Sequence, residues 1–189
     1  MKICVFCSSS NYLDKAYYDE AIALGDLIAK NGFELVYGGT TVGLMGKVAE
    51  ASKAGGAVVS GVIPVFIKDK GISNPDCDNL FVTDNMRERK AKLESISDAF
   101  MALPGGFGTL EEILEIITLK QLQRHDKPIV FINTGGFYNN LILFFESVFQ
   151  HRFASDSHRD VFALVGSAAE AIDYIKTYQP TIRRDKWGG

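Results

Sequence analysis

The sequence predicts an α/β fold in which helices cover both faces of a parallel sheet. Short apolar or β-branched runs alternate along the chain with longer segments of helical periodicity. The short runs are apolar at nearly every position, which is typical of strands buried on both sides. Small-residue turns follow several of them, as in sheets that bind ligands at their carboxyl ends. We therefore expect a single-domain, Rossmann-like, doubly wound parallel sheet over residues 1–189.

The individual elements follow from these patterns. Strands are expected in the runs "KICVFC", "FELVYG", "AVVSGVIP", "LFVT", "AFMALPG" and "PIVFIN", with a last short strand at residues 162–165. Helices are expected at residues 17–30, 44–54, 85–97, 110–124, 138–149 and 168–178, where the period is helical. Residues 66–79 form the loosest segment, with Gly71 and Pro75, and are predicted to flank a ligand site.

Composition and charge exclude several classes of function. The net charge is −3 and the pI is about 5.6, so there is no general basic field for nucleic acid or an anionic membrane. No apolar stretch approaches the roughly 20 residues that span a bilayer. The start "MKICVFCSSS" has too short an apolar run for a signal peptide. These features predict a cytoplasmic protein that binds a small molecule.

The cysteines and histidines do not predict a metal site or a cofactor. Cys4 and Cys7 are spaced as C-x-x-C, but in a strand their side chains point to opposite faces, so we expect reduced structural thiols. His125, His151 and His158 are scattered without ligand spacing and are interpreted as surface or interface residues.

Three turns of small residues follow predicted strands, namely "CSSSN", "GGTTVGLMG" and "PGGFGTLEE". Glycine lets the backbone approach a ligand, and the N–H groups of the next helix attract an anion. The alternative is that these are ordinary glycine-rich turns of an α/β fold. If they bind phosphate or substrate, the candidate residues are Ser8, Ser9, Gly39, Thr40, Gly43, Gly105, Gly106, Gly108 and Thr109.

The common nucleotide-binding motifs do not match. The first turn lacks G-x-G-x-x-G, and "GGTTVGLMGK" has Val48 where a P-loop has Ser or Thr. A nucleoside monophosphate or a sugar phosphate therefore fits better than a dinucleotide or a nucleoside triphosphate.

Arg89 lies on the same helical stripe as Met86, Leu93 and Ile96, and therefore faces inward. Its planar guanidinium suits a phosphate or a carboxylate. The alternative is a structural ion pair.

Glu112 has two interpretations. Thr109 and Glu112 have the spacing of a capping box, in which Glu112 bonds the Thr109 N–H. However, Glu112 lies off the apolar stripe of its helix, so it is free to face a ligand cleft. Because a carboxylate repels phosphate, it is expected beside the sugar.

These segments resemble a known family. "PGGFGTLEE" resembles the P-G-G-x-G-T-x-x-E motif of the LONELY GUY (LOG) family, and "GGTTVGLMG" and "MRERK" resemble its companion motifs. The resemblance covers roughly residues 2–178. It implies a cytokinin riboside 5′-monophosphate phosphoribohydrolase, which releases the free base and ribose 5-phosphate from AMP or N6-modified AMP. It also implies that Arg89 and Glu112 are catalytic, and Met86 and Lys90 of "MRERK" are counted with the substrate-binding residues.

Two departures from the family pattern concern the substrate. Plant members commonly have His where Arg87 stands and a third glycine where Thr40 stands, so the preference for prenylated or plain AMP stays open. The family's older label, lysine decarboxylase, lacks support, since nothing marks a pyridoxal-phosphate lysine. The alternatives are a nucleotide or molybdenum-cofactor carrier without hydrolysis and a broad nucleoside 5′-monophosphate nucleosidase.

Two helices carry more apolar residues than one face against a sheet can bury. In "YNNLILFFESVFQHRF" and "ILEIITLKQLQ" these residues wrap around the helix, which predicts at least a homodimer. The resemblance likewise implies dimers with active sites near the subunit boundary. The alternative is that the C-terminal helix and the tail to Trp187 cover this surface.

Overall fold

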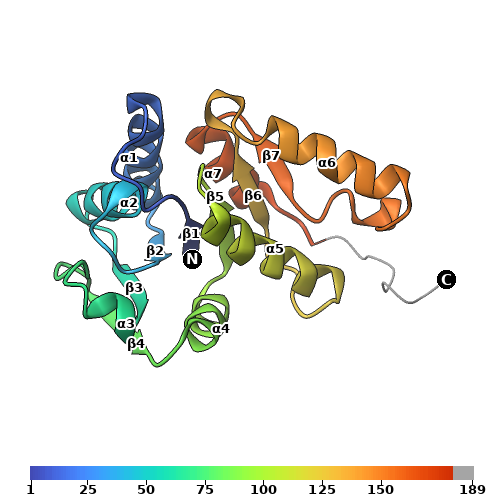
Figure 1. Ribbon diagram of the computed structural model, residues 1–189. Coiled ribbons are helices and arrows are strands. Elements are labelled where there is room, and N and C mark those ends of the chain that lie inside the picture. Colours follow the sequence, from blue (N-terminus) through green and yellow to red (C-terminus); the bar gives the residue numbers. More distant parts are fainter. Residues whose placement is uncertain (181–189) are drawn as a thin grey trace.

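The computed structural model describes residues 1–180, which form a seven-stranded parallel sheet in the order β4-β3-β2-β1-β5-β6-β7 (Figure 1). The strands are β1 (Lys2–Phe6), β2 (Glu34–Tyr37), β3 (Val59–Pro64), β4 (Asn79–Thr83), β5 (Ala99–Ala102), β6 (Ile129–Ile132) and β7 (Ala163–Val165). The strand order reverses between β1 and β5, which pair from Ile3 beside Ala99 to Phe6 beside Ala102. In such sheets this reversal opens a crevice at the carboxyl ends of the strands.

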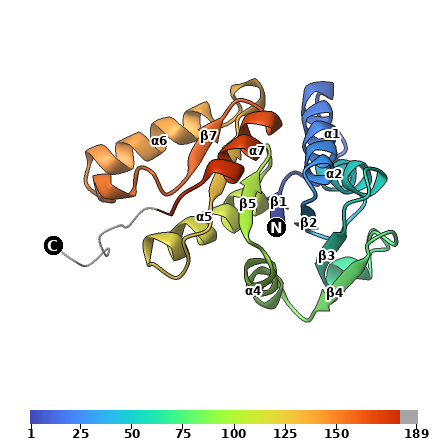
Figure 2. The same ribbon diagram turned by 180° about the vertical axis from the view of Figure 1, so that it is seen from behind.

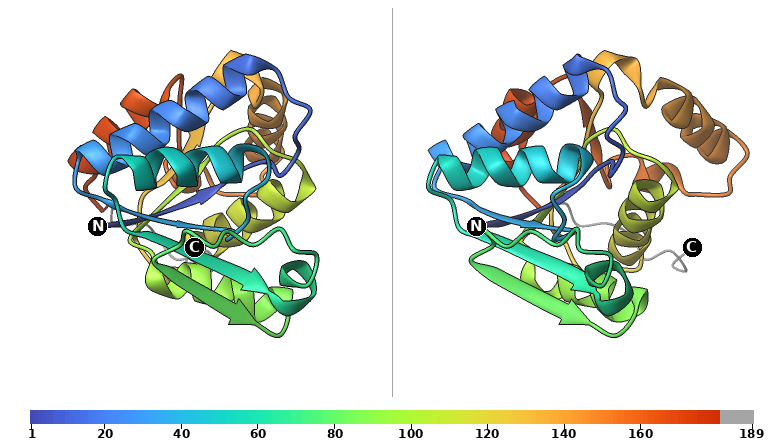
Figure 3. Two further views of the ribbon diagram at one scale, coloured as in Figure 1. Left: turned by 90° about the vertical axis from the view of Figure 1, so that its left-hand side faces the viewer. Right: turned by 60° about the vertical axis from the view of Figure 1, so that its left-hand side comes forward.

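Helices cover both faces of the sheet, so the predicted fold class is confirmed. The helices are α1 (Lys15–Lys30), α2 (Gly43–Ala54), α3 (Val65–Lys68), α4 (Met86–Ile96), α5 (Phe107–Gln121), α6 (Asn139–Gln150) and α7 (Ala168–Thr177), with short 3-10 helices η1 (Thr134–Gly136) and η2 (Asp156–His158). Figure 3 shows α1 and α2 on one side of the sheet and α4 on the other. From behind, α7 lies on the same side as α1 (Figure 2).

Each face of the sheet has its own apolar core. One core joins alternate strand residues to α1, α2 and α7, and the other joins the intervening residues to α4, α5 and α6. Cys7 belongs to the first core and Cys4 to the second, and all three cysteines are free thiols. The prediction that Cys4 and Cys7 point to opposite faces is therefore confirmed.

The predicted elements are all present, but the bounds of α5 are wrong. The helix was expected at residues 110–124 and lies at Phe107–Gln121. It begins early because Thr109 packs on Gly105, where an added Cβ would lie 2.1 Å from Thr109 Oγ1. It ends early because Gln123 adopts φ 56° and its N–H donates to Lys120 O at 3.1 Å. No helix within residues 1–180 is long and apolar enough to cross a membrane.

Candidate active site

The three small-residue turns meet at the carboxyl ends of the strands. The Ser8 N–H donates to Pro104 O at 3.2 Å, and the Leu44 N–H donates to Ser8 O at 2.9 Å. The first turn, after β1, thus lies between the second, after β2, and the fifth, after β5. Of its two candidate residues, Ser8 is half-buried and Ser9 is exposed.

The second turn is held from two sides. Gly39 and Gly43 have φ of 78° and 59°, and a Cβ on Gly43 would lie 2.6 Å from Ser8 O. Gly43 is therefore required by the packing of the first turn, whatever the ligand. On the other side the Asn74 N–H donates to Gly39 O at 2.9 Å, and Thr40 is buried. Asn74 belongs to the predicted loose segment 66–79, of which residues 66–68 are the end of α3, so this segment contacts the turn. That it flanks a ligand site stays a prediction.

The fifth turn, "PGGFGTLEE", is open at Gly106 and Gly108, whereas Gly105 is buried against Thr109. A Cβ added at Gly106 or Gly108 meets no other described atom within 4 Å. Among the described residues, no side chain caps the N-terminus of α5. The same holds for α1, α2 and α6, whereas Asn85 caps α4 and Ser167 caps α7. An uncapped helix N-terminus with open glycines offers its N–H groups to an anion.

Arg89 is buried inside the α4–α5 junction with 7% of its surface exposed. Its Nε donates to Val62 O within β3, at 3.0 Å, and its Nη1 forms an ion pair with Glu112 Oε1 on α5. The inward orientation expected from the helical stripe is confirmed. The fork of the guanidinium thus joins β3 to Glu112, the carboxylate expected beside the sugar.

Glu112 is 9% exposed and contacts Arg89. Burial raises the pKa of Glu112, and the adjacent Arg89 guanidinium opposes that rise. The capping-box alternative is wrong, because Gly106 is the N-cap of α5 and Thr109 lies inside the helix. Arg89 does form an ion pair, as the alternative interpretation expects. Its partner is Glu112, the other residue predicted to be catalytic.

A second set of charges lies beside this pair. Lys90 forms ion pairs with Glu111 and with Glu115, the latter at 2.6 Å, and its hydrogen bonds to them raise its pKa. Met86 is half-buried on the same helix. Lys90 is thus engaged by carboxylates in this structure, and the predicted contact of Lys90 and Met86 with substrate stays a prediction.

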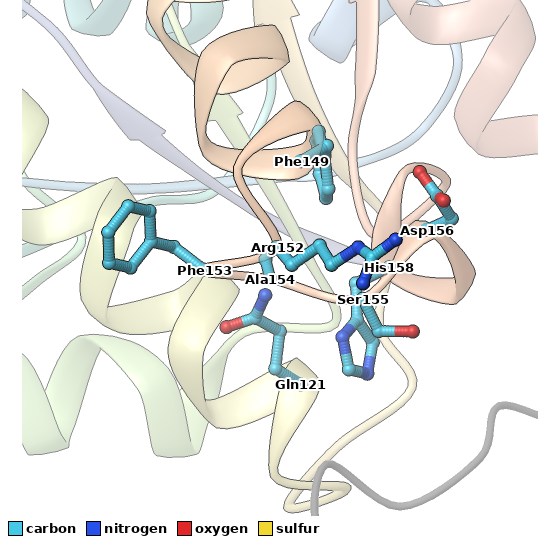
Figure 4. Close-up of a pocket in the computed structure, with 8 residues that line it drawn as sticks. All are labelled: Gln121, Phe149, Arg152, Phe153, Ala154, Ser155, Asp156 and His158. Atoms are coloured by element: carbon cyan, nitrogen blue, oxygen red, sulfur yellow. The ribbon is translucent and has the colours of Figure 1, made fainter.

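His158 differs from the interpretation of the histidines as surface or interface residues, and His125 is only partly exposed. His158 is 2% exposed, and His125 is half-buried with a ring nitrogen 3.0 Å from Ile116 O. His158 lines a cavity of about 470 Å³ at the end of α6, together with Gln121, Phe149 and Arg152 (Figure 4). This cavity lies at the C-terminal end of α5, away from the turns at its N-terminus.

Sequence reasoning missed several residues that shape the site. Asn11 accepts a hydrogen bond from the Gly43 N–H at 2.8 Å, and Val62 supplies the carbonyl that holds Arg89. Gly38 leaves the space that Arg89 fills. The "GG" pair at residues 38–39 was the signal for Gly38, but the pattern did not tell which of the two glycines faces Arg89.

Comparisons with known proteins show which family the chain is similar to. Residues 45–175 match the family model described as "Possible lysine decarboxylase". The chain is 43% identical over 186 residues to LOGL6 of Oryza sativa subsp. japonica, covering 98% of this chain and 73% of that one. It is 39% identical over 183 residues to LOG3 of Arabidopsis thaliana, which is named a cytokinin riboside 5′-monophosphate phosphoribohydrolase, covering 97% and 85%.

The fold is also similar to solved structures. The molybdenum cofactor binding protein of Rippkaea orientalis aligns with a TM-score of 0.71 at 21% identity, covering 93% of this chain and 95% of that one. At this identity the likeness establishes the fold alone.

Proposed function

The chain belongs to the LOG family of cytokinin riboside 5′-monophosphate phosphoribohydrolases, and we propose that it hydrolyses the N-glycosidic bond of AMP or N6-prenyl-AMP. The products are the free base and ribose 5-phosphate. The observation that carries the proposal is the buried contact of Arg89 with Glu112 beside an open, uncapped helix N-terminus. One part suits the reacting sugar and the other suits its phosphate.

Glu112 acts on the sugar. Breaking the bond between C1′ and the base nitrogen builds positive charge at C1′, which a nearby carboxylate stabilises. Water adds its oxygen to C1′, one of its protons passes to the carboxylate, and the base leaves with the bonding electrons and takes up a proton. Arg89 orients the carboxylate and the nucleotide through its planar donors.

The glycine turns bind the 5′-phosphate. In this proposal the anion lies at the N–H groups of α5 near Gly106, Gly108 and Thr109, with the first two turns around it. Binding energy from the phosphate, which does not react, then contributes to orienting the sugar.

The direct test is incubation with AMP and with isopentenyl-AMP, followed by chromatography of the free base and an assay for ribose 5-phosphate. We expect equal amounts of both products, and their ratio between the two substrates gives the base preference. Glu112→Gln serves as the matched control. Tight binding of AMP without base release contradicts hydrolysis and favours the carrier function.

We also propose a homodimer formed through α5 and α6. Leu143, Phe144 and Phe153 are 67%, 62% and 83% exposed, and a cavity of about 270 Å³ lined by Phe144, Phe145 and Phe153 lies beside them. A stable interface removes such an aromatic surface from water. The alternative from the sequence is that the C-terminal helix and the tail to Trp187 cover this surface. The helix α7 instead packs with α1 in the core on the other face of the sheet, and the tail lies outside the described residues.

Light scattering tests the dimer. We expect about twice the 20.8 kDa chain mass at micromolar concentration, and a mass near the single chain after Phe144→Glu. A parent mass of one chain with full activity contradicts the proposal. We place the protein in the cytoplasm, where its three free thiols stay reduced.

A further inference from the structure

Gly38 lies where a strand end meets the buried arginine. It follows β2 directly, and a Cβ built on it would lie 2.7 Å from Arg89 Nη2 and 2.6 Å from Met45 Sδ. Real Cβ atoms essentially never lie this close to another atom, so a side chain here requires the ends of the Arg89 and Met45 side chains to shift. The cost of the shift depends on how freely each of them can move. Gly38 is absent from the described glycines with positive φ, so its backbone tolerates an L-residue and only the space is limiting.

The guanidinium has little freedom to give way. Its Nε is bonded to Val62 O at 3.0 Å, and its Nη1 is paired with Glu112. Since the group is planar, these two anchors fix the direction of Nη2, which is the guanidinium atom nearest the Cβ built on Gly38. A methyl group at position 38 therefore displaces the guanidinium as a whole and changes its contact with the carboxylate.

Met45 is the second neighbour. It lies in the first turn of α2, and its Sδ accepts a hydrogen bond from Thr40 Oγ1 at 3.7 Å. Gly38 thus lies in the second small-residue turn at the point where side chains from α2 and α4 meet.

We propose that Gly38 is a positioning residue that sets the location of the Arg89 guanidinium relative to Glu112. This rests on the proposed function for its effect on catalysis, whereas the placement of Arg89 is measurable without turnover. Gly38 acts through Arg89, and its own atoms do not need to touch substrate.

The first experiment is steady-state base release from AMP by Gly38→Ala. Because misplacing a reacting group by 1 Å can lower the rate about 100-fold, we expect kcat to fall on that order while KM changes much less. Gly55→Ala is the matched control. Its Cβ would lie 2.5 Å from Ala29 Cβ at the far end of α2, so it is expected to lower Tm and leave kcat unchanged. Parent kcat in Gly38→Ala overturns the proposal.

A double-mutant cycle separates positioning from a general loss of packing. In an Arg89→Lys background, Gly38→Ala is expected to lower kcat by less than about twofold, since the group it acts through is already gone. An undiminished effect in that background overturns the proposal. If Gly38→Ala does not fold, Gly38→Ala with Met45→Ala relieves one of the two contacts and leaves the contact with Arg89.

The Nε–H signal of Arg89 gives a readout that needs no activity. In ¹H–¹⁵N spectra it is assigned by its loss in Arg89→Lys, and it is expected to exchange slowly because it is buried against Val62 O. Gly38→Ala is expected to shift it and speed its exchange, and an unchanged signal overturns the proposal. If the parent releases no base, the proposed function fails, and this spectrum still decides the role of Gly38.

Discussion

The first turns of α5 carry two regions that are built in opposite ways, namely the ion pair of Glu112 with Arg89 and the helix N-terminus at Gly106 and Gly108. At Glu112 the charged groups are buried and satisfied from within, by Arg89 and by the carbonyl of Val62. At Gly106 and Gly108 the backbone is exposed and no described side chain caps it. The reacting groups are thus oriented before substrate arrives, whereas the anion site is left for the ligand to fill. Each prediction below alters one region and leaves the other intact.

The largest effect is expected for Glu112→Gln. The amide keeps the shape and still accepts a hydrogen bond from Arg89, but it loses the charge that stabilises the sugar cation. Base release from AMP is expected to fall about 1,000-fold, in the range found when one electrostatic contact to a transition state is removed. Calorimetric binding of ribose 5-phosphate is expected to be retained. Near-parent turnover returns Glu112 to a purely structural role.

Arg89→Lys is expected to have the next largest effect. A lysine has one nitrogen and cannot donate to Val62 O and to Glu112 with the geometry of a planar fork. We expect kcat to fall about 100-fold with an intact far-UV circular dichroism spectrum. Since the exposed Arg87 lies on the same helix, Arg87→Lys is the control and should leave kcat unchanged. Equal losses in both variants argue against a specific role for Arg89.

Gly108→Asp alters the open end alone. An acidic residue in the first turn of a helix stabilises it by about 0.3–1 kcal/mol, yet the same charge repels a phosphate. We expect KM for AMP to rise about tenfold while kcat stays at the parent value. Tm should be unchanged or higher. Adenosine, which lacks the phosphate, provides the control substrate. If KM is unchanged, the anion does not bind at this helix end.

The smallest effect concerns pH. Glu112 must be ionised to act, and burial raises its pKa above the usual range of a glutamate, so activity should be lost on acidification at a higher pH than for an ordinary carboxyl. The titratable groups around it include Arg89, Lys90 and Glu94 on α4, Glu111 and Glu115 on α5, and the thiols of Cys4 and Cys7. Lys90→Met removes a positive charge and leaves Glu111 unneutralised.

Both changes in Lys90→Met disfavour ionised Glu112, so the acidic limb of the kcat/KM profile should move to higher pH, by less than about one unit. A shift to lower pH contradicts this electrostatic assignment. The alkaline side of the profile provides an internal reference, since the ionised form of Glu112 already dominates there.

The fold was predictable because the spacing of apolar residues in the sequence matches the pattern of burial along most of the chain. The seven strands are short and apolar and the helices are amphipathic, so the pattern was sufficient. The start of α5 was missed because residues 107–109 contain a glycine and resemble a turn. Their helical conformation depends on the packing of Thr109 against Gly105, which is a tertiary contact.

The candidate site was predictable in its residues and less so in its contacts. Helical period placed Arg89 inside, but the direct pairing of Arg89 with Glu112 depends on how α4 and α5 pack. The same limit explains Gly38, whose neighbours come from α2 and α4. His158 was assigned to the surface because a lone histidine carries no periodic signal for burial.

The hydrogen bond from Ser8 to Pro104 has a consequence for how the protein folds. It joins residues 96 positions apart, and Leu44 bonds to Ser8 as well, so the ligand cleft does not exist until β5 has docked beside β1. Contacts of such large sequence separation form late and slow the folding of the chain. The amide proton of Ser8 should therefore exchange with solvent only when the whole sheet opens, which makes the cleft as long-lived as the native state itself.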